Sequence, residues 1–263
     1  MIGLTTVNIE LTNVCNKSCF MCGRRKVERD YPDLAQTYNV EMPFELLETI
    51  KQHIPEGIVV QFHNNGDPTC YSRLGDALDL FSKNIRCFNT NGKLIVEKAN
   101  EIINHMETLT ISVIPNDPEG DEQYELVQKF IKLKGSRPPY LVYRLLGNVD
   151  GSRYHELPGL ICTRILHSPM GSFEYTRKVT VPEIGVCLDL LNHCTIDVYG
   201  NVSTCVRFDP HRYGQLGNIK FLTLTEMWNG EKRQSLIKEH LKGNRSANKL
   251  CEQCSFYGCP TGV

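Results

Sequence analysis

The sequence predicts an α/β fold: parallel strands and helices that form a full or partial barrel, followed by a smaller module of one β-hairpin and one helix. Short apolar runs alternate with helical patterns as far as residue 146. Parallel strands need helical crossovers, so this alternation is typical of a barrel whose functional loops follow the strand ends. Further on, alternating strand character across a Gly200–Asn201 turn predicts the hairpin.

The barrel elements follow in order along the chain. Apolar runs that end in turn residues predict strands at 7–11, 57–62, 85–90, 109–114 and 139–146. Between them, apolar residues at helical spacing predict helices at 44–54, 73–83, 93–103 and 124–133. From about residue 150 to 185 the rhythm breaks, which predicts loops and connecting segments rather than a packed unit.

A second module is expected to begin near Val181, which divides the chain into a barrel over 1–180 and an auxiliary domain over 181–263. After the hairpin, the segment 224–243 has the pattern of one helix. Trp228 within it is most simply a packing anchor of the module.

Composition limits the classes of function. The hydrophobic content of 41% supports a real core, and a formal net charge of −1 argues against a strongly basic surface for nucleic acid or anionic membranes. No apolar run approaches the ~20 residues that span a bilayer, and the N-terminus has no signal-like pattern. We therefore expect a cytoplasmic protein, with no membrane partner and no indication of nucleic-acid binding.

The sequence contains twelve cysteines, and three of them lie close together after the first strand, at Cys15, Cys19 and Cys22. Tight spacing and the missing signal favour metal ligation over disulfides. Three thiolates at this spacing can hold one face of a [4Fe–4S] cluster and leave one iron without protein sulfur. An open iron indicates that an outside molecule completes the coordination.

Other polar residues follow the neighbouring strands. Asn65, Gly66 and Asp67 come after the second strand, Asn91 after the third, and Ser112 near the end of the fourth. We expect these strand ends to converge around the cysteine loop. His63 and His167 are more simply ordinary hydrogen-bonded histidines than substrate ligands.

A second group of cysteines lies in the auxiliary module, at Cys187, Cys205, Cys251 and Cys254. Four thiolates can close a [4Fe–4S] cluster, and they can equally form a tetrahedral zinc site. Either Cys194 or Cys259 could replace one of these four ligands, but we expect both to lie outside the set. Cys70, Cys87 and Cys162 are expected to be small buried hydrophobic residues.

Residues 10–22, ELTNVCNKSCFMC, resemble the cluster loop of the radical S-adenosylmethionine (SAM) superfamily. The second module resembles a twitch domain, the shortened form of the SPASM domain that carries an auxiliary iron–sulfur cluster. The pattern behind this second resemblance is the cysteine set with Gly200, LGNI at 216–219 and MWNG at 227–230. Together the resemblances imply a partial (β/α)6 TIM-like radical SAM barrel followed by a twitch/SPASM-like module.

The resemblance also implies roles for single residues. Asn65-Gly66-Asp67 takes the place of the family's Gly-Gly-Glu motif, whose backbone carbonyls and acid receive the SAM ammonium group. Asn91 and Ser112 would bond the ribose or carboxylate of SAM, and Arg144 the carboxylate. Met21 stands where the family usually has an aromatic residue beside the adenine, and a thioether can pack on a purine.

The implied cofactors are SAM on a first [4Fe–4S] cluster and an auxiliary [4Fe–4S] cluster, and the implied product of SAM is a 5′-deoxyadenosyl radical. Similarity to the family's aminocyclitol dehydrogenases implies oxidation of a small polar, sugar-like or aminocyclitol-like substrate. Arg144, Arg153 or Arg164 would bind this substrate or assist its deprotonation, although arginine stays charged and is a poor general base. An electron donor such as flavodoxin or ferredoxin would be a partner. The alternatives are a peptide- or protein-modifying maturase and a non-catalytic iron–sulfur electron carrier.

Overall fold

The structure is a computed structural model that describes residues 3–164, 166, 186–206, 209–252 and 254. It is built on one nine-stranded sheet in the order β6-β5-β4-β3-β2-β1-β7-β8-β9. The strands are β1 (Thr6–Ile9), β2 (Val59–Gln61), β3 (Ile85–Thr90), β4 (Thr108–Val113), β5 (Tyr140–Leu146), β6 (Leu160–Arg164), β7 (His193–Ile196), β8 (Asn201–Ser203) and β9 (Gln215–Asn218). Strands β1 to β6 are parallel, as the fold class requires, and the barrel is not closed.

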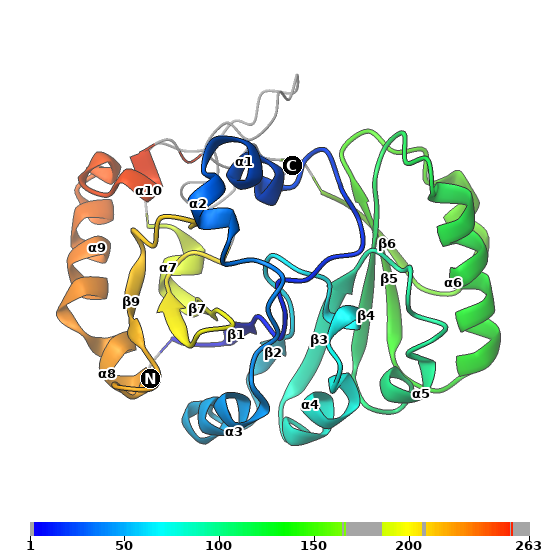
Figure 1. Ribbon diagram of the computed structural model, residues 1–263, viewed down its shortest axis with the longest axis horizontal. Coiled ribbons are helices and arrows are strands. Elements are labelled where there is room, and N and C mark those ends of the chain that lie inside the picture. Colours follow the sequence, from blue (N-terminus) through cyan, green and yellow to red (C-terminus); the bar gives the residue numbers. More distant parts are fainter. Residues whose placement is uncertain (1–2, 165, 167–185, 207–208, 253, 255–263) are drawn as a thin grey trace.

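Helices cover the outside of this curved sheet, as Figure 1 shows for α4, α5 and α6. The helices of the barrel are α1 (Gly23–Asp30), α2 (Pro32–Ala35), α3 (Phe44–His53), α4 (Leu74–Leu80), α5 (Ala99–Ile102) and α6 (Gly120–Lys134), with short 3-10 turns η1 (Pro68–Cys70) and η2 (Ser152–Glu156). Apolar side chains alternate along the strands toward these helices, so Val7, Ile9 and Val60 are fully buried with Leu47 and Phe130.

The other face of the strands is polar. It carries Asn8, His63, Asn89, Ser112 and Arg144 at alternate positions, and the functional side chains discussed below come from this concave face and from the loops above it. The fold therefore places its polar chemistry on the inside of an open barrel.

The hairpin β7–β8 forms as expected, with Gly200 in the left-handed region at φ +87°. Its first strand also pairs in parallel with β1, in the register Thr6 to His193. The second half of the chain thus extends the same sheet. Its helices are α7 (Leu188–Asn192), α8 (Leu224–Asn229), α9 (Glu231–Leu241) and α10 (Lys249–Glu252), with the turn η4 (Arg245–Ala247). The proposed boundary at 180/181 falls among residues outside the described ranges and stays a prediction.

Three predictions about elements were wrong. The loop region from residue 150 contains a sixth strand, β6, which pairs with β5 at the sheet edge, where Leu160 is 53% exposed and gives no clear apolar signal. The helix expected over 224–243 is two helices, because the backbone at Gly230 is extended, in a position so close to the Glu226 carbonyl oxygen that only glycine fits. The helix expected over 93–103 is restricted to α5.

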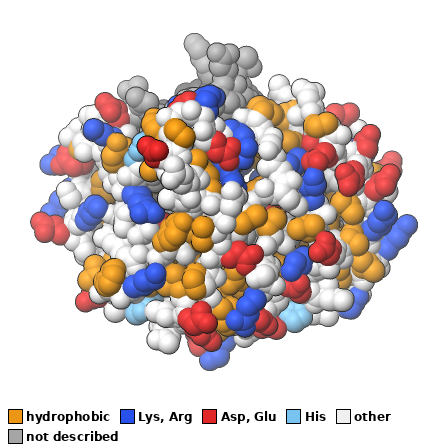
Figure 2. All heavy atoms as spheres, in the orientation of Figure 1, with side chains coloured by type: hydrophobic (Ala, Val, Ile, Leu, Met, Phe, Trp, Pro, Cys, Tyr) orange, Lys and Arg blue, Asp and Glu red, His pale blue; other side chains and the backbone are white. Residues whose placement is uncertain are grey.

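Trp228 is fully buried and lies under the Arg233 guanidinium, 3.5 Å from the ring centroid, which confirms its packing role. Among the described residues no helix is long and apolar enough to cross a membrane. On the face drawn in Figure 2, acidic and basic side chains are interspersed, in keeping with the balanced charge of the sequence.

Candidate functional site

The loop after β1 brings its three cysteines together beside the start of α1. Cys15, Cys19 and Cys22 are half-buried, and Cys22 directly precedes α1. Burial, followed by the charges of Cys22 and Cys15, raises the pKa of the Cys19 thiol to about 12. The three thiols are therefore close enough for their charges to interact, and bound iron would offset the cost of the thiolate form. This arrangement fits three ligands of one cluster.

Asn91 ties the loop after β3 to this cysteine loop. Its amide Nδ2 donates to Asn16 Oδ1 at 2.8 Å and lies 3.9 Å from Cys15 Sγ. The contact places the Asn91 side chain next to the first cysteine, where the resemblance expects SAM. Its role toward SAM stays a prediction.

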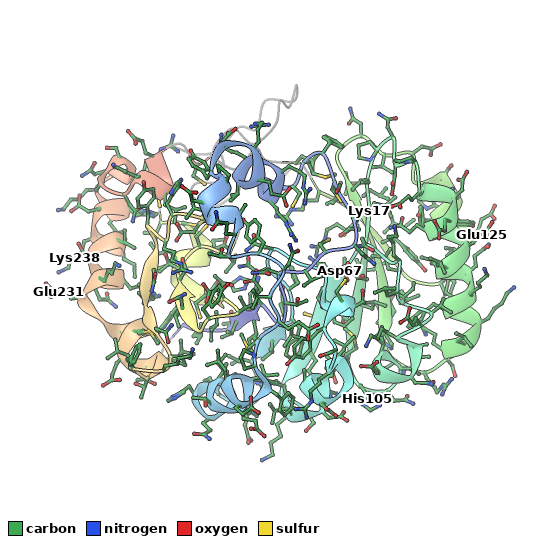
Figure 3. The ribbon with its side chains drawn as sticks, in the orientation of Figure 1. Lys17, Asp67, His105, Glu125, Glu231 and Lys238 are labelled. Atoms are coloured by element: carbon green, nitrogen blue, oxygen red, sulfur yellow. The ribbon has the colours of Figure 1, made fainter. Side chains whose placement is uncertain are left out.

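Asp67 is buried within the protein and holds two loops together. Its Oδ1 accepts hydrogen bonds from the backbone and hydroxyl of Thr69, and its Oδ2 accepts one from the Asn91 backbone at 2.7 Å. The Thr90 hydroxyl lies 3.0 Å from both oxygens. Burial raises the pKa of Asp67, and these donors oppose the rise. Figure 3 shows Asp67 below Lys17 near the upper ends of the barrel strands. The carboxylate organises the loops that would receive SAM.

Asn65 and Gly66 fix the second loop against the first. A Cβ on Gly66 would lie 2.3 Å from the Thr12 carbonyl oxygen and 2.6 Å from that of Val14, so only glycine allows this approach. The backbone and side-chain nitrogens of Asn65 both donate to Glu10 Oε1 at 2.9 Å. The asparagine that replaces a family glycine thus has a partner of its own in this chain.

Two residues that the sequence did not single out support the site. Gln123 on α6 is buried, and its Nε2 donates to the carbonyl oxygens of Asn91 at 2.6 Å and Ser112 at 3.0 Å. Lys17, between the first two cysteines, pairs with Asp117 and Glu119 after β4. Gln123 lies just before the helix expected over 124–133 and within the longer α6, so the sequence pattern gave no signal for it, and no local pattern pointed to Lys17.

Ser112 and Arg144 are adjacent on β4 and β5 and face the concave side. The Arg144 charge reaches His63, whose pKa is lowered to about 3, first by burial and then by Arg144 and Arg164. His63 Nε2 lies 3.0 Å from Asn89 Nδ2, so this histidine has the hydrogen bond expected of it, while its Nδ1 has no partner among the described residues. The inside of the barrel is therefore positively charged beside a neutral imidazole.

Other expectations have mixed outcomes. Arg153, in the turn η2, contacts the N-terminal end of α6. Its guanidinium donates hydrogen bonds to Asp121 Oδ1 at 2.6 Å and to the Gly120 carbonyl oxygen at 2.7 Å. Cys70, Cys87 and Cys162 are only half-buried, because Cys87 and Cys162 lie on the open inner face and Cys70 in the turn η1. Met21 is half-buried in the turn between Cys19 and Cys22. His167 and Cys259 lie outside the described residues.

The second cysteine set surrounds a small cavity of about 50 Å³. Its lining includes the four thiols of Cys187, Cys205, Cys251 and Cys254 together with apolar side chains. Burial raises the pKa of Cys251 to about 12, and the charges of the other three cysteines add to the rise. Cys194 is fully buried and does not line the cavity. In the described part of the chain no three potential ligands converge on a point suited to a single metal ion. The four cysteines line one cavity, as the ligands of one cluster or of one zinc ion would.

Comparisons with known proteins agree with this geometry. The S-adenosyl-L-methionine-dependent 2-deoxy-scyllo-inosamine dehydrogenase of Niallia circulans is 22% identical over 260 residues, 95% of this chain and 92% of the relative. Among solved structures, BtrN in complex with AdoMet and 2-DOIA matches with a TM-score of 0.70, 17% identity and coverage of 95% and 92%. Native anSMEcpe with bound AdoMet and Kp18Cys peptide matches with a TM-score of 0.66, 14% identity and coverage of 95% and 88%.

The SPASM family, an iron-sulfur cluster-binding domain, matches residues 187–255. The chain shares the fold of these AdoMet-bound proteins, and its residues 187–255 match the SPASM domain. The SPASM match includes Cys187, Cys205, Cys251 and Cys254, so the thiols of the second cavity all belong to the domain. The resemblance seen in the sequence is thereby confirmed, while the assignment of individual ligands stays a prediction.

Proposed function

We propose that this protein is a radical SAM oxidoreductase that cleaves SAM reductively and uses an auxiliary [4Fe–4S] cluster. The observation that carries the proposal is the presence of two distinct cysteine sets on one sheet: three thiols beside β1, which leave one iron open, and four around the SPASM cavity. An electron carrier needs no open iron. The SPASM match and the relatives' dependence on SAM support the same reading.

The first cluster would be held by Cys15, Cys19 and Cys22, and the second by the four thiols of the SPASM cavity. Bound to the first cluster, SAM would supply a 5′-deoxyadenosyl radical that removes a hydrogen atom from the substrate. The protein's own residues then position SAM: Gly66 allows the close loop approach, and Gln123 holds the carbonyls of Asn91 and Ser112. A preorganised loop set of this kind keeps a reactive species aligned and away from water.

The substrate that we propose is a small polar sugar-like or aminocyclitol-like alcohol, which is oxidised to a ketone. The 2-deoxy-scyllo-inosamine dehydrogenase activity of the relative supports this choice, as does a concave face lined by polar residues such as Asn8, Asn89 and Arg144. After losing a hydrogen atom from its carbinol carbon, the alcohol must lose one proton and one electron. The auxiliary cluster is the acceptor that we propose for this electron, and a flavodoxin or ferredoxin is the donor for SAM cleavage.

A peptide-modifying maturase is the second candidate. The structural likeness to anSMEcpe with a bound peptide, and to SuiB of Streptococcus suis bound to its precursor peptide SuiA with a TM-score of 0.59, supports it. The SuiB match has 13% identity and covers 97% of this chain and 74% of SuiB. We favour the aminocyclitol-like substrate over a peptide, because the dehydrogenase of Niallia circulans matches this chain over 92% of its own length.

The test is anaerobic reconstitution with iron and sulfide, followed by SAM and dithionite, with iron and 5′-deoxyadenosine measured. About eight irons per chain with product supports two [4Fe–4S] clusters and radical chemistry. If about four irons per chain are found and 5′-deoxyadenosine still forms, the SPASM site holds zinc or no metal. Deuterium transfer from carbinol-deuterated 2-deoxy-scyllo-inosamine into 5′-deoxyadenosine identifies the alcohol class. Clusters that produce no 5′-deoxyadenosine with or without this alcohol contradict the proposal.

A further inference from the structure

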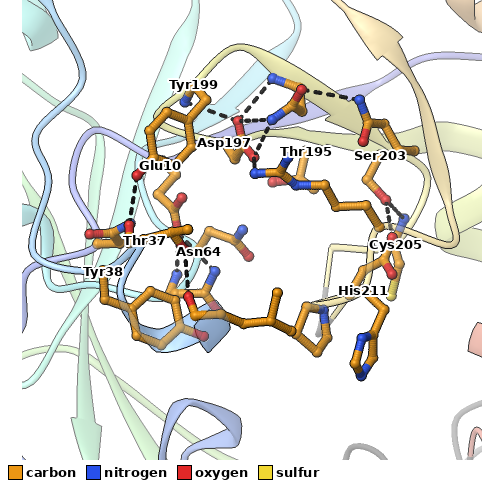
Figure 4. A pocket seen from close by; sticks show the side chains of 18 residues that line it. Glu10, Thr37, Tyr38, Asn64, Thr195, Asp197, Tyr199, Ser203, Cys205 and His211 are labelled. Carbon is orange, nitrogen blue, oxygen red and sulfur yellow. Dashed lines mark hydrogen bonds and ion pairs between the residues drawn. The ribbon is translucent and has the colours of Figure 1, made fainter. Parts of the chain in front are cut away.

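A polar cavity of about 320 Å³ lies beside the loops that follow β1 and β2 (Figure 4). It shares only Cys205 with the lining of the cysteine cavity. Its walls include residues of β7, β8 and β9, Glu10 directly after β1, and residues of the segment 34–38, which includes the end of α2. Asn65 of the second SAM loop lines it, and so does Cys205 of the SPASM set. A molecule bound here would therefore lie next to both functional regions of the protein.

A buried carboxylate faces this cavity. Glu10 is 2% exposed, and its Oε1 accepts both hydrogen bonds from Asn65, while its Oε2 accepts only a long bond of 3.3 Å from the Val198 backbone. Among the described residues no cation forms an ion pair with it. A buried charge without a counter-ion is costly. Burial accordingly raises the pKa of Glu10 to about 7, with a further contribution from the charge of Asp197.

An unsatisfied hydroxyl lines the same cavity. Thr195 on β7 is 4% exposed, and its Oγ1 has no hydrogen-bond partner within the described part of the chain. More than nine in ten buried polar groups have a partner, so an unpaired hydroxyl at a cavity wall marks a place where a bound molecule supplies one. This observation is independent of the carboxylate and comes from a different strand.

The charges around the cavity favour a cation. Asp197 and Asp209 add two carboxylates to that of Glu10, and Arg212 lies 3.7 Å from Asp197 with 47% of its side chain exposed. Arg212 therefore offsets Asp197 at the rim and leaves Glu10 uncompensated inside. Tyr38 also lines the cavity and provides a flat surface for a ring.

We propose that this cavity binds a small polyhydroxylated primary amine, with its ammonium group on Glu10 and a ring hydroxyl on Thr195. The inference rests on the proposed function, because it assigns the cavity to the substrate of that reaction. It goes further in naming the cationic group that the site selects and the two residues that recognise it. A substrate here would also lie beside Cys205, on the path of the electron that the oxidation releases.

The test is anaerobic isothermal titration calorimetry on the reconstituted full chain with SAM and no reductant. The probes are 2-deoxy-scyllo-inosamine, which carries the ammonium group, and scyllo-inositol, a neutral polyol of similar size. We expect saturable binding of the amine, weakened at least tenfold by Glu10→Gln, and weaker binding of the neutral polyol that this substitution leaves unchanged. Thr195→Val should weaken binding of the amine severalfold without lowering the thermal midpoint, because the hydroxyl loses no partner in the free protein.

Two results would overturn the inference: amine binding that is the same in Glu10→Gln and the natural protein, or no saturable amine binding up to about 10 mM. If Glu10→Gln does not fold, Thr195→Val decides alone, and unchanged binding in that variant also overturns the inference. Formation of 5′-deoxyadenosine is measured separately. If 5′-deoxyadenosine forms but the amine does not bind, this binding site is rejected and the proposed function stands. If the amine binds but no 5′-deoxyadenosine forms, the binding site stands and the proposed function is rejected.

Discussion

Lys17 Nζ lies 2.5 Å from Asp117 Oδ2, with side chains that are 7% and 4% exposed, and so joins the cysteine loop to the loop after β4. Lys17 also lies 3.3 Å from Glu119 Oε2, and Lys93 Nζ lies 2.5 Å from Glu119 Oε1. Loops that follow three different strands are thereby connected by buried or half-buried charges. Because the first cysteine loop has little regular structure of its own, these contacts determine how firmly it is held.

Lys17→Met should loosen the cysteine loop. Removing one partner of a buried pair leaves the other charge uncompensated, which costs about 3 kcal/mol of unfolding free energy. We expect that loss in urea unfolding, together with faster release of iron to a chelator. The matched control is Lys83→Met, whose pair with Glu56 has side chains 69% and 61% exposed. This variant should change stability by less than about 1 kcal/mol. Equal losses in the two variants would contradict the role of Lys17.

Gly66→Ala should abolish SAM cleavage. The added methyl group would overlap the carbonyl oxygens of Thr12 and Val14, which forces the second loop away from the first. Gly120→Ala is the control, since its nearest neighbour would be the end of the Arg153 side chain at 3.4 Å. Formation of 5′-deoxyadenosine should fall at least a hundredfold in Gly66→Ala, a loss of about 3 kcal/mol in transition-state stabilisation, and stay within twofold in the control. An active Gly66→Ala enzyme would show that the loops need not approach so closely.

Gln123→Glu should weaken SAM binding. The substitution keeps the shape but removes the Nε2 donor, so the carbonyls of Asn91 and Ser112 lose their partner at a cost of about 1–3 kcal/mol. Equilibrium dialysis should show about tenfold weaker SAM binding. Gln128→Glu makes the same change at an exposed position of α6 and should bind SAM normally. Normal binding by both variants would assign Gln123 to packing alone.

Glu10 should give the stability a specific pH dependence. Its pKa is about 7 in the folded protein, against 4.5 for a solvated glutamate, so the folded state binds the proton more tightly. The contribution of this group is fully present below pH 4.5 and is lost as the pH rises through 7. A shift of this size corresponds to about 3 kcal/mol. Asp197 is the titratable group whose charge acts on Glu10, whereas the pKa values of Tyr38 and Tyr199 are raised and both stay uncharged over this range.

The measurement is urea unfolding of the natural protein and of Glu10→Gln at several pH values. Other titrating groups, including Asp67, are common to both proteins and cancel in the difference. Relative to Glu10→Gln, the natural protein should lose stability between pH 4.5 and 7 and change little above that range. A difference that does not depend on pH would mean that Glu10 titrates normally in the folded state.

Cys251→Ala should remove about four irons per chain, because Cys251 lines the SPASM cavity with three other cysteines. The first cluster and uncoupled SAM cleavage should remain. Cys194→Ala is the control: Cys194 is buried on β7 but does not line that cavity, so the iron content should not change. If Cys194→Ala lost about four irons and Cys251→Ala lost none, Cys194 rather than Cys251 would be the cluster ligand.

The sequence predicted the parts of the fold that local pattern determines. Strands β1 to β5 have apolar, β-branched runs between turn residues, and Gly200–Asn201 marks the hairpin. Strand β6 was missed because it lies at the sheet edge, where one face has no need to be apolar. The break at Gly230 was missed because it depends on an extended backbone conformation close to the Glu226 carbonyl, which glycine allows, rather than on periodicity.

The candidate site was predictable where chemistry depends on spacing, as in Cys15, Cys19 and Cys22. Its supporting contacts were not. Glu10 and Asn65 are 55 residues apart, and Lys17 and Asp117 are 100 apart. Such pairs are formed by tertiary packing, and nothing in the local sequence of either residue specifies the other. For the same reason Asn65 appeared only as a departure from the family's glycine, although it is a partner of Glu10.

The parallel pairing of β1 with β7 has a consequence for how the protein is made. Thr6 leaves the ribosome well before its neighbour His193, which lies 187 residues further along the chain. At roughly 5–20 residues per second, this delay is about 10–40 s. During that time one hydrogen-bonding edge of β1 is open to other chains. Translation that stops before residue 193 would leave the strand that carries the cysteine loop permanently unpaired on that edge, so such fragments should depend on chaperones to stay out of aggregates.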